Sequence, residues 1–446
     1  MNILFILTDQ QHRDALGCMG NPDVDTPHLD RLAESGILFR RCYSNDPVCG
    51  PYRGSLLTGQ YTSRCGVIRN GQRLPVGTPT FAEAFNQAGY HTAWVGKWHL
   101  GANGNEPIPP DLQGGFQRFF GYQCYNDFYQ NIWFYDHFGK RHEKSGHRTE
   151  ATTNLAMEQV DDIAKAQKPF LLMVSYQAPH YPVQPAAEYA AMYKGREIHH
   201  RPNCQRETDP YTPTNSPPSP RPFEQDPTYK SYGGNLDEYI RLYNAMCTQI
   251  DANVGRLLEH LQQLGLAEDT AIIFTSDHGD MQGSHGRTNK CLPYEESAGV
   301  PLIIHLPGTG GGRVTDHLVS GIDFMPTCIE LAGIDPVPGV DGKSIAGFLN
   351  AEADTTRDAV FSERGDAWCM IVQDGWKLAA HRQEEGLVPM LMTHLDKDPY
   401  ELRNRSQDPE VAELRHRLLA KLHAWDQDVR SGDTGSASQI ASERML

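Results

Sequence analysis

Residues 45–59 bring a cysteine, a proline and an arginine together at short spacing, as Cys49, Pro51 and Arg53. The small and apolar residues that follow them predict a helix that begins near Cys49. At a helix N-terminus the unpaired backbone N–H groups and the helix dipole favour an anion. A lone cysteine in such a place is more often a packed small hydrophobe, so the rest of the chain must decide between a structural and a chemical role.

Polar side chains also follow four predicted strands at the point where each strand ends. Buried apolar strands are expected over residues 2–8, 91–96, 169–176 and 271–276. The residues at or just beyond their ends are Asp9, Gln10, Lys97, His99, His180, Asp277 and His278. Asp and His are common turn residues, but ligands of open α/β sheets bind outside the carboxyl ends of the strands. Carboxylate and amide oxygens suit Ca²⁺ or Mg²⁺, and an imidazole makes Mn²⁺ admissible as well.

Strands that alternate with amphipathic helices predict a doubly wound α/β domain over residues 1–354. Its helices are expected over residues 26–34, 80–88 and 235–264, and a further strand is expected over 300–305. Such a domain places the polar strand ends described above at one edge of one sheet.

The character of the sequence changes near residue 355. Apolar segments at 368–372 and 376–380 flank an Asp-Gly pair and predict a β-hairpin. Residues 387–395 are expected to supply another strand, and residues 409–427 a charged amphipathic helix. Residues 355–446 are therefore predicted to form a small α+β subdomain.

Residues 199–232 form a Pro-rich insertion that also holds many Asn, Thr, Ser and Arg residues. So long a segment without predicted structure is a functional loop or a disordered one, and we expect a loop near the mouth of a pocket. Its basic residues His199, His200, Arg201 and Arg206, and exposed members of an aromatic stretch at 116–138, are candidates for binding an anionic sugar. Core packing accounts for most of the aromatic residues, and a solvated loop accounts equally for the basic ones.

The composition limits the classes of partner and the compartment. A formal charge of −16 argues against nucleic acid, although a basic pocket in an acidic body can still hold an anionic small molecule. The first nine residues predict a buried strand rather than a signal peptide, and no segment has the apolar length of a membrane span. The ten cysteines contain no Cys-x-x-Cys pair. We therefore expect reduced thiols, no membrane association and a cytoplasmic location.

The segment Cys49-Gly50-Pro51-Tyr52-Arg53 resembles the Cys-x-Pro-x-Arg signature of the type I, formylglycine-dependent sulfatases of the alkaline phosphatase superfamily. Further blocks in the family's order extend the resemblance over nearly the whole chain. They are Asp9-Gln10-Gln11, Gly96 to Gly101, Ala178-Pro179-His180, Thr275 to Asp280 with Gly283 to Gly286, Lys290 and Tyr294 to Ser297, and Leu395 to Leu402. The resemblance implies a large mixed, mostly parallel sheet flanked by helices, with a small C-terminal α+β subdomain.

In this family the cysteine is oxidised to formylglycine (3-oxoalanine) by a formylglycine-generating enzyme, and the aldehyde hydrate is the nucleophile. The resemblance implies that one hydroxyl of the hydrate attacks sulfur and that the second then expels sulfate. It also implies one divalent cation, with calcium first and manganese or magnesium as alternatives. The implied ligands are Asp9, Gln10, Asp277, His278 and an oxygen of the modified Cys49.

The resemblance also implies roles for further residues. Arg53 would orient the hydrate, and Lys97 and Lys290 would bind the sulfate oxygens. His180 would bind sulfate or help to protonate the leaving alcohol, and His99 would take the proton whose removal releases sulfate. Cations placed in this way complement the charge that develops on the transferred group.

The implied reaction is hydrolysis of a sulfate monoester, carried by a carbohydrate or by an aryl or alkyl alcohol. The family commonly has Asp-Asp where this chain has Asp9-Gln10, and Asp-Gln openings occur in choline-sulfatase-like and phosphonate-monoester-hydrolase-like relatives. One alternative is a formylglycine-dependent phosphonate monoester or phosphodiester hydrolase, whose members generally lack the Lys97 and His99 pair. Another is a non-catalytic anion-binding homologue with Cys49 unconverted. The implied partners are a small sulfated substrate and the maturation enzyme, and a homo-oligomer is left open.

Overall fold

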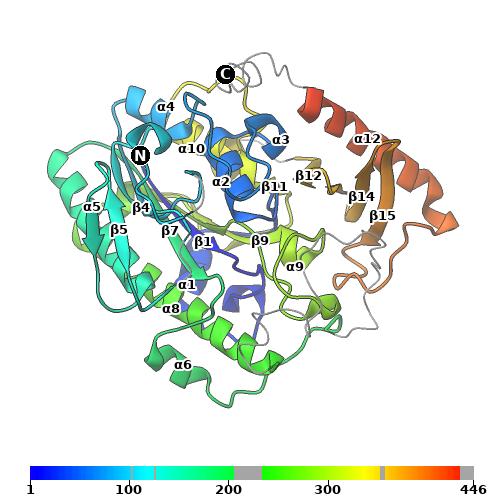
Figure 1. Ribbon diagram of the computed structural model, residues 1–446, viewed down its shortest axis with the longest axis horizontal. Helices are drawn as coiled ribbons and strands as arrows, with labels where there is room; N and C mark the ends of the chain where they lie inside the picture. The colour runs from blue at the N-terminus through cyan, green and yellow to red at the C-terminus, as the bar shows by residue number, and fades with distance from the viewer. Residues whose placement is uncertain (102–103, 125–126, 205–233, 352–356, 432–446) are drawn as a thin grey trace.

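The computed structural model describes residues 1–101, 104–124, 127–204, 234–351 and 357–431 (Figure 1). Most of the predicted insertion at 199–232 and the last fifteen residues lie outside these ranges. The predicted domain boundary between residues 354 and 355 also lies outside them and stays a prediction. Within the described residues, no helix is long and apolar enough to cross a membrane.

A large sheet forms the centre of the molecule, with the strand order β10-β2-β9-β8-β1-β7-β3-β4-β5-β6 and with β11 paired to β2. Its strands are β1 (Asn2–Asp9), β2 (Ile37–Tyr43), β3 (His91–Lys97), β4 (Arg118–Tyr122), β5 (Trp133–Asp136), β6 (Arg141–Glu143), β7 (Phe170–Pro179), β8 (Thr270–Ser276), β9 (Gly299–His305), β10 (Arg313–Thr315) and β11 (Val319–Ser320). The run from β8 to β4 is parallel, whereas β9 is antiparallel to both of its neighbours. The sheet is therefore mixed and mostly parallel, as predicted.

Helices cover both faces of this sheet, which explains why its central strands are continuous apolar runs. Leu4 and Ile6 of β1 pack with α1 (Pro27–Ser35), α5 (Arg148–Ala166) and α8 (Leu236–Gln263). The alternate residues Ile3, Phe5 and Leu7 pack on the other face, because successive side chains of a strand point to opposite sides. That face carries α2 (Cys49–Thr58), α4 (Phe81–Gln87) and α10 (Phe324–Leu331), and the short helices are α3 (Thr62–Cys65), α6 (Ala187–Tyr193), α9 (Glu295–Ala298) and α11 (Ala346–Leu349).

A second, four-stranded antiparallel sheet follows in the C-terminal part, in the order β12-β13-β14-β15. Its strands are β12 (Ala359–Arg364), β13 (Trp368–Gln373), β14 (Trp376–Gln383) and β15 (Gly386–His394). The predicted hairpin is present, with Asp374 and Gly375 both at positive φ, as a two-residue turn of this kind requires. One face packs on Tyr43 and Tyr294 of the large domain, and the other packs on α12 (Ala412–Ser431; Figure 1). The small α+β subdomain is thereby confirmed.

The segment after the first helix differs from the expectation. Strand β2 (Ile37–Tyr43) is not among the strands expected from the sequence, and it pairs with β9, β10 and β11. Such pairing joins segments more than 250 residues apart, and the local pattern does not encode it.

Gly96 sets the close approach of β3 to β7, and it directly precedes Lys97. Its φ is +111°, and a Cβ atom there would lie 2.0 Å from the carbonyl oxygen of Ser175. Gly96 and Ser175 are partners in the β3–β7 ladder. Only a residue without a side chain fits there. Gly96 therefore allows β3 to lie close against β7 immediately before Lys97, the last residue of the strand.

We expect Gly96→Ala to lower the free energy of unfolding by more than Gly89→Ala does. Gly89 also has a positive φ (+85°), but its added Cβ would meet nothing within 4 Å. The left-handed backbone should cost both variants about 1–2 kcal/mol, and overpacking against Ser175 should cost Gly96→Ala about 1–3 kcal/mol more. Urea unfolding of the two purified variants measures the difference, and equal midpoints would contradict this account.

Candidate active site

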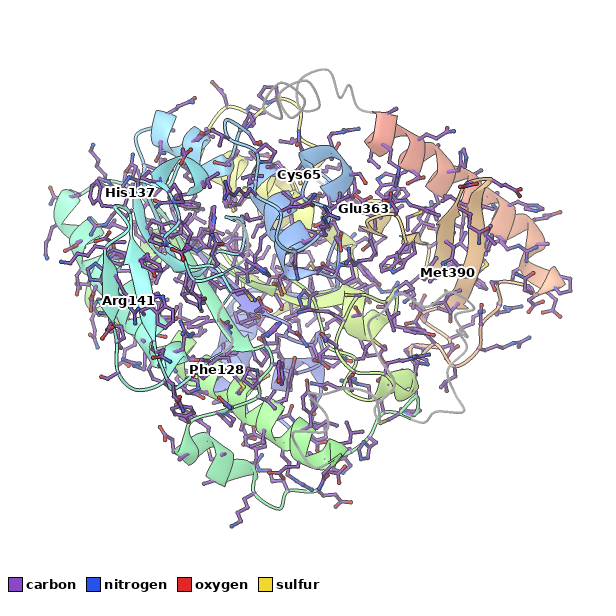
Figure 2. All side chains as sticks on the ribbon, viewed as in Figure 1. Cys65, Phe128, His137, Arg141, Glu363 and Met390 are labelled. Atoms are coloured by element: carbon purple, nitrogen blue, oxygen red, sulfur yellow. The ribbon has the colours of Figure 1, made fainter. Side chains whose placement is uncertain are left out.

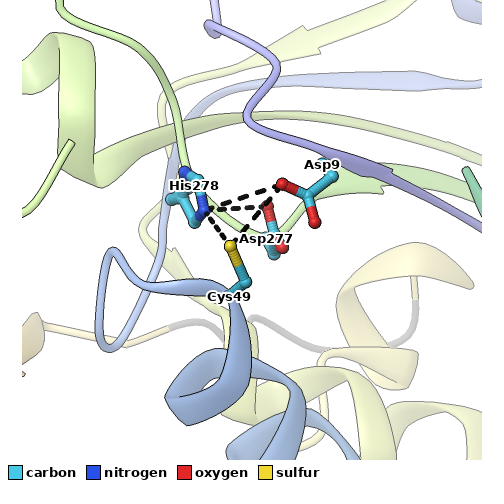
Figure 3. Close-up of side chains that lie close together, drawn as sticks. All are labelled: Asp9, Cys49, Asp277 and His278. Carbon is cyan, nitrogen blue, oxygen red and sulfur yellow. Dashed lines mark hydrogen bonds and ion pairs between the residues drawn. The ribbon is translucent and has the colours of Figure 1, made fainter. Parts of the chain in front are cut away.

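The chemistry-bearing residues meet at the carboxyl ends of β1 and β8, opposite the first turn of α2 (Figure 3). These two strands are parallel neighbours, so Asp9 and Asp277 leave the sheet side by side. The Cys49 Sγ lies 3.2 Å from His278 Nε2 and 3.6 Å from Asp9 Oδ1. One ligand atom from each of Asp9, Cys49, Asp277 and His278 falls within 4.8 Å of the others, and all four residues are buried.

Arg53 lies one helical turn after Cys49 on α2 and is fully buried. Its Nη2 is 3.0 Å from Asp9 Oδ2 and 3.3 Å from Asp277 Oδ2. Its Nη1 donates to the Lys97 carbonyl and to Ser175 Oγ, at 2.8 and 2.7 Å. Arg53 is therefore the shared counter-charge of two carboxylates, and it is held in place from β3 and β7.

Two lysines add further positive charge beside Cys49 and the carboxylates. Lys97 Nζ lies 2.7 Å from Asp9 Oδ2, and Lys290 Nζ lies 3.2 Å from Cys49 Sγ and 2.8 Å from Gln10 Oε1. Burial alone would lower the pKa of each lysine. The negative charge of Asp9 for Lys97, and of Cys49 and Asp9 for Lys290, outweighs burial and raises both pKa values. Both side chains therefore stay ammonium groups.

Two of the three histidines in the site share one hydrogen-bond pattern. His278 Nδ1 donates to the Gly279 carbonyl and His180 Nδ1 to the Tyr181 carbonyl, at 3.0 and 2.6 Å. Each Nε2 therefore carries a lone pair when the ring is neutral, as a metal ligand or a base requires. Burial, with Lys290 and Lys97, lowers the pKa of His180 to about 4. His99 is buried at φ +62°, and burial lowers its pKa as well.

Hydrogen bonds that the sequence does not predict hold the Gln10 side chain beside Lys290 in this cluster. Its backbone has φ +65°, and its Nε2 donates to Asp280 Oδ2 at 2.5 Å. Asp280 also accepts from Tyr239 on α8, at 2.9 Å. The Gln10 amide is thereby held with its oxygen at Lys290. Asp280 belongs to the block Thr275 to Asp280 that resembles the sulfatase family. No pattern in the sequence predicts that Gln10 is its hydrogen-bond partner.

The electrostatics of the cluster fit a bound cation. Burial raises the pKa of Asp277, and repulsion by Asp9 adds to the rise. Burial and Cys49 also act to raise the pKa of Asp9, but Lys97, His180 and Arg53 outweigh them and lower it. A divalent cation between the two carboxylates would relieve their repulsion. Two carboxylates and an imidazole lone pair are also the donor set that such a cation takes.

The other candidates from the sequence lie elsewhere. His199 is 2.7 Å from Asp23, and His200 is 2.8 Å from Asp237. With Arg201, which lies 3.2 Å from His12, these histidines line a pocket of about 300 Å³ that does not include Cys49 or the carboxylates beside it, and Arg206 lies outside the described residues. In the aromatic stretch, Phe116, Phe119, Tyr122, Phe128, Trp133, Phe134 and Tyr135 are buried, and Phe138 is 88% exposed.

This fold and this site together define a hydrolase of the alkaline-phosphatase-like class. A family model described as Sulfatase matches residues 1–334, and one described as N-sulphoglucosamine sulphohydrolase, C-terminal, matches residues 283–428. The chain belongs to the sulfatase family and is a sulfatase enzyme, as the resemblance implied.

Three similar proteins illustrate the range of the family. The chain is 31% identical over 438 residues to an ulvan-active sulfatase of Formosa agariphila, with 95% of this chain and 80% of that protein covered. A solved structure of a protein in complex with its substrate D-glucosamine-2-N,6-O-disulfate has a TM-score of 0.82 at 26% identity, covering 97% of this chain and 98% of that one. A phosphonate monoester hydrolase from Silicibacter pomeroyi has a TM-score of 0.76 at 26% identity, covering 98% and 96%.

A buried ionic network ties the C-terminal subdomain to the site. Lys377 on β14 lies 2.5 Å from Glu401 and 3.2 Å from Glu295, and Glu295 pairs with Arg13 at 2.8 Å. The Glu295 backbone N–H donates to Glu401 at 2.7 Å. The network thus joins the segment after Lys290 to the segment after Gln10, and Glu401 belongs to the block Leu395 to Leu402.

We expect Lys377→Met to lower the free energy of unfolding by about 3–5 kcal/mol, because it leaves two buried carboxylates short of a counter-charge. The matched control is Arg430→Ala, which removes an exposed ion pair to Asp366 from the same subdomain and should cost less than about 1 kcal/mol. Urea unfolding compares the two variants. A Lys377→Met midpoint as high as that of Arg430→Ala would show that the network is not needed for stability.

Proposed function

We propose that this enzyme hydrolyses a sulfate monoester of a carbohydrate and that Cys49, converted to formylglycine by a maturation enzyme, supplies the nucleophile. The observation that carries the proposal is the convergence on Cys49 of two carboxylates and three cationic side chains. A buried cysteine that only packs would not need this set of charges, because burying each of them is costly. Three cations suit an anionic ester, and two carboxylates suit a metal.

The residues present fit a divalent cation, and Asp9, Asp277, His278 and an oxygen of the converted Cys49 would hold it. Gln10 stays a candidate ligand, since its oxygen also accepts from Lys290. Bound there, the ion would act as a Lewis acid that favours ionisation of the nucleophile. Calcium is our first choice because most of the donors are oxygen atoms, and manganese and magnesium are the alternatives.

The chain's own residues perform the remaining tasks in this proposal. Lys97 and Lys290 bind the sulfate oxygens as ammonium groups, and Arg53 compensates negative charge at the nucleophile. Neutral His180 donates from Nδ1 and interacts with the Cys49 side chain, so its Nε2 lone pair can take a proton; an arriving anion would raise its pKa and let it pass that proton to the leaving alcohol. His99 interacts with the Cys49 side chain and would act as the base that takes the proton whose removal releases sulfate.

The substrate class rests on the relatives and on one pair of residues. The names of the similar proteins point to ulvan and to a sulfated glucosamine, both carbohydrates. A formylglycine-dependent phosphonate monoester hydrolase is the second candidate, favoured by the similar solved structure. Lys97 and His99 together favour the sulfate ester, because the phosphonate enzymes generally lack this pair.

We expect the proteolytic peptide that contains Cys49 to be lighter than the encoded one by the difference between a thiol and an aldehyde, or to carry the hydrate. The protein should come from its native host or from co-expression with a formylglycine-generating enzyme. Cys49→Ala should lower kcat for a sulfated sugar at least about 10³-fold, as the loss of a nucleophile does. An unmodified peptide from protein with full turnover would refute the proposal, and faster turnover of phenylphosphonate esters would favour the second candidate.

We also expect one divalent cation to bind per chain and Asp277→Asn to weaken its binding by at least about tenfold, because the variant loses a carboxylate ligand. Gln10→Asp should tighten it, because the substitution adds one. Calorimetric titration of the chelator-treated protein with Ca²⁺, Mn²⁺ and Mg²⁺ measures both effects and ranks the ions. Unchanged binding in Asp277→Asn would place the cation elsewhere.

A further inference from the structure

A fourth cation reaches the neighbourhood of the site, and it comes from the C-terminal subdomain. Strand β12 ends at Arg364, next to Glu363 (Figure 2). Thr62 Oγ1 and the Ser63 backbone N–H of α3 both donate to Glu363, at 2.8 and 2.9 Å. The end of β12 is therefore fixed to the large domain just beyond α2, the helix that carries Cys49.

On one side, Arg364 contacts the loop that covers the first turn of α2. Its Nη1 donates to the Ile68 carbonyl at 3.1 Å. Two residues further on, the Asn70 side chain accepts from the Gly50 backbone N–H at 2.9 Å. Gly50 directly follows the nucleophile position, so a single short loop links Arg364 to it.

On the other side, Arg364 meets the segment that supplies Lys290. Its side chain interacts with that of Cys291, and the Cys291 carbonyl accepts from Trp368 Nε1 at 3.0 Å. Lys290, the preceding residue, lies 3.2 Å from Cys49 Sγ. Arg364 is therefore bracketed by two segments that each contact the residue 49 region, and Cys49 is among the groups whose charge it feels.

Within the described residues, the Arg364 guanidinium makes no ion pair, unlike its neighbours. Arg357, Arg382 and Arg430 each hold a carboxylate, at 2.5 to 2.9 Å. The acid that acts on Arg364 most strongly is Asp46, but burial raises the pKa of Asp46 well above its ordinary value. A partly buried guanidinium without a fixed counter-charge is available to an anionic ligand.

We propose that Arg364 binds a second anionic group of the substrate, a sulfate or a carboxylate, beside the sulfate that is cleaved. The inference rests on the proposed function and narrows its substrate class to sugars with two acidic groups. Lys97 and Lys290 face Cys49 and are taken by the reacting sulfate. Arg364 is a further cation between the two segments that contact the residue 49 region, and its planar fork matches both sulfate and carboxylate. The exposed Arg69 and Arg73, on the same loop as Ile68, add positive potential.

The test compares Arg364→Ala with the wild-type enzyme on matched substrates. Glucosamine 2-N,6-O-disulfate and N-acetylglucosamine 6-O-sulfate share a sugar and a 6-sulfate but differ in the second acidic group, and a sulfated uronic acid disaccharide supplies a carboxylate instead. We expect KM to rise about tenfold or more for the doubly charged substrate and less than about twofold for the singly charged one. The substrate that responds, disulfated or uronic, identifies the acidic group that Arg364 binds. Equal rises for both classes, or no rise, would overturn the inference.

Two sets of controls follow. The first excludes a general loss of stability as the cause of a change in KM, and the second tests binding without relying on the proposed catalytic function. Arg430→Ala removes an arginine from the same subdomain and should leave both KM values unchanged, and Arg364→Lys should recover part of the loss. Calorimetric binding of the same sugars to Cys49→Ala, with and without Arg364→Ala, needs no turnover. The double variant should lose its preference for the doubly charged sugar, and retention of that preference would overturn the inference even if Cys49 proves not to be the nucleophile.

Discussion

The site depends on one constraint, the burial of two carboxylates at the ends of adjacent parallel strands. Asp9 and Asp277 cannot both stay ionised in a dry environment without cations. Arg53 supplies a buried positive charge for both carboxylates, because its Nη2 lies 3.0 Å from Asp9 and 3.3 Å from Asp277. Because Arg53 lies one turn after Cys49 on α2, the same interaction that stabilises the carboxylates also places residue 49 above them.

The C-terminal subdomain is part of this arrangement rather than an appendage to it. Through Lys377 and Glu401 it supports the segments that follow Gln10 and Lys290. Through Arg364, which donates to the Ile68 carbonyl, it supplies the cation that we propose binds a second acidic group of the substrate. In this proposal one small sheet provides both the support and the recognition, so the outer part of the pocket can vary while the strand ends that hold the charges stay fixed.

Much of this could be predicted from the sequence because it is encoded locally. The apolar strands, the capped helices and the Asp-Gly hairpin each have a pattern a few residues long, and the polar residues at strand ends follow from parallel-sheet geometry. Strand β2 and the bonds of Gln10 to Asp280 and Lys290 were not predictable in this way. They join residues about 270 positions apart, and no local pattern specifies such partners.

Because residue 49 is buried in the folded protein, any enzymatic oxidation of its side chain has to precede the completion of folding. Cys49 is 1% exposed, and its surroundings are complete only when β8 has paired with β1 and Lys290 has been delivered. An enzyme that oxidises this side chain therefore has to reach it before the sheet closes. The 241 residues from position 50 to Lys290 take roughly 12–48 s to translate. The burial that keeps the finished site dry thus also limits the time in which its cysteine is accessible.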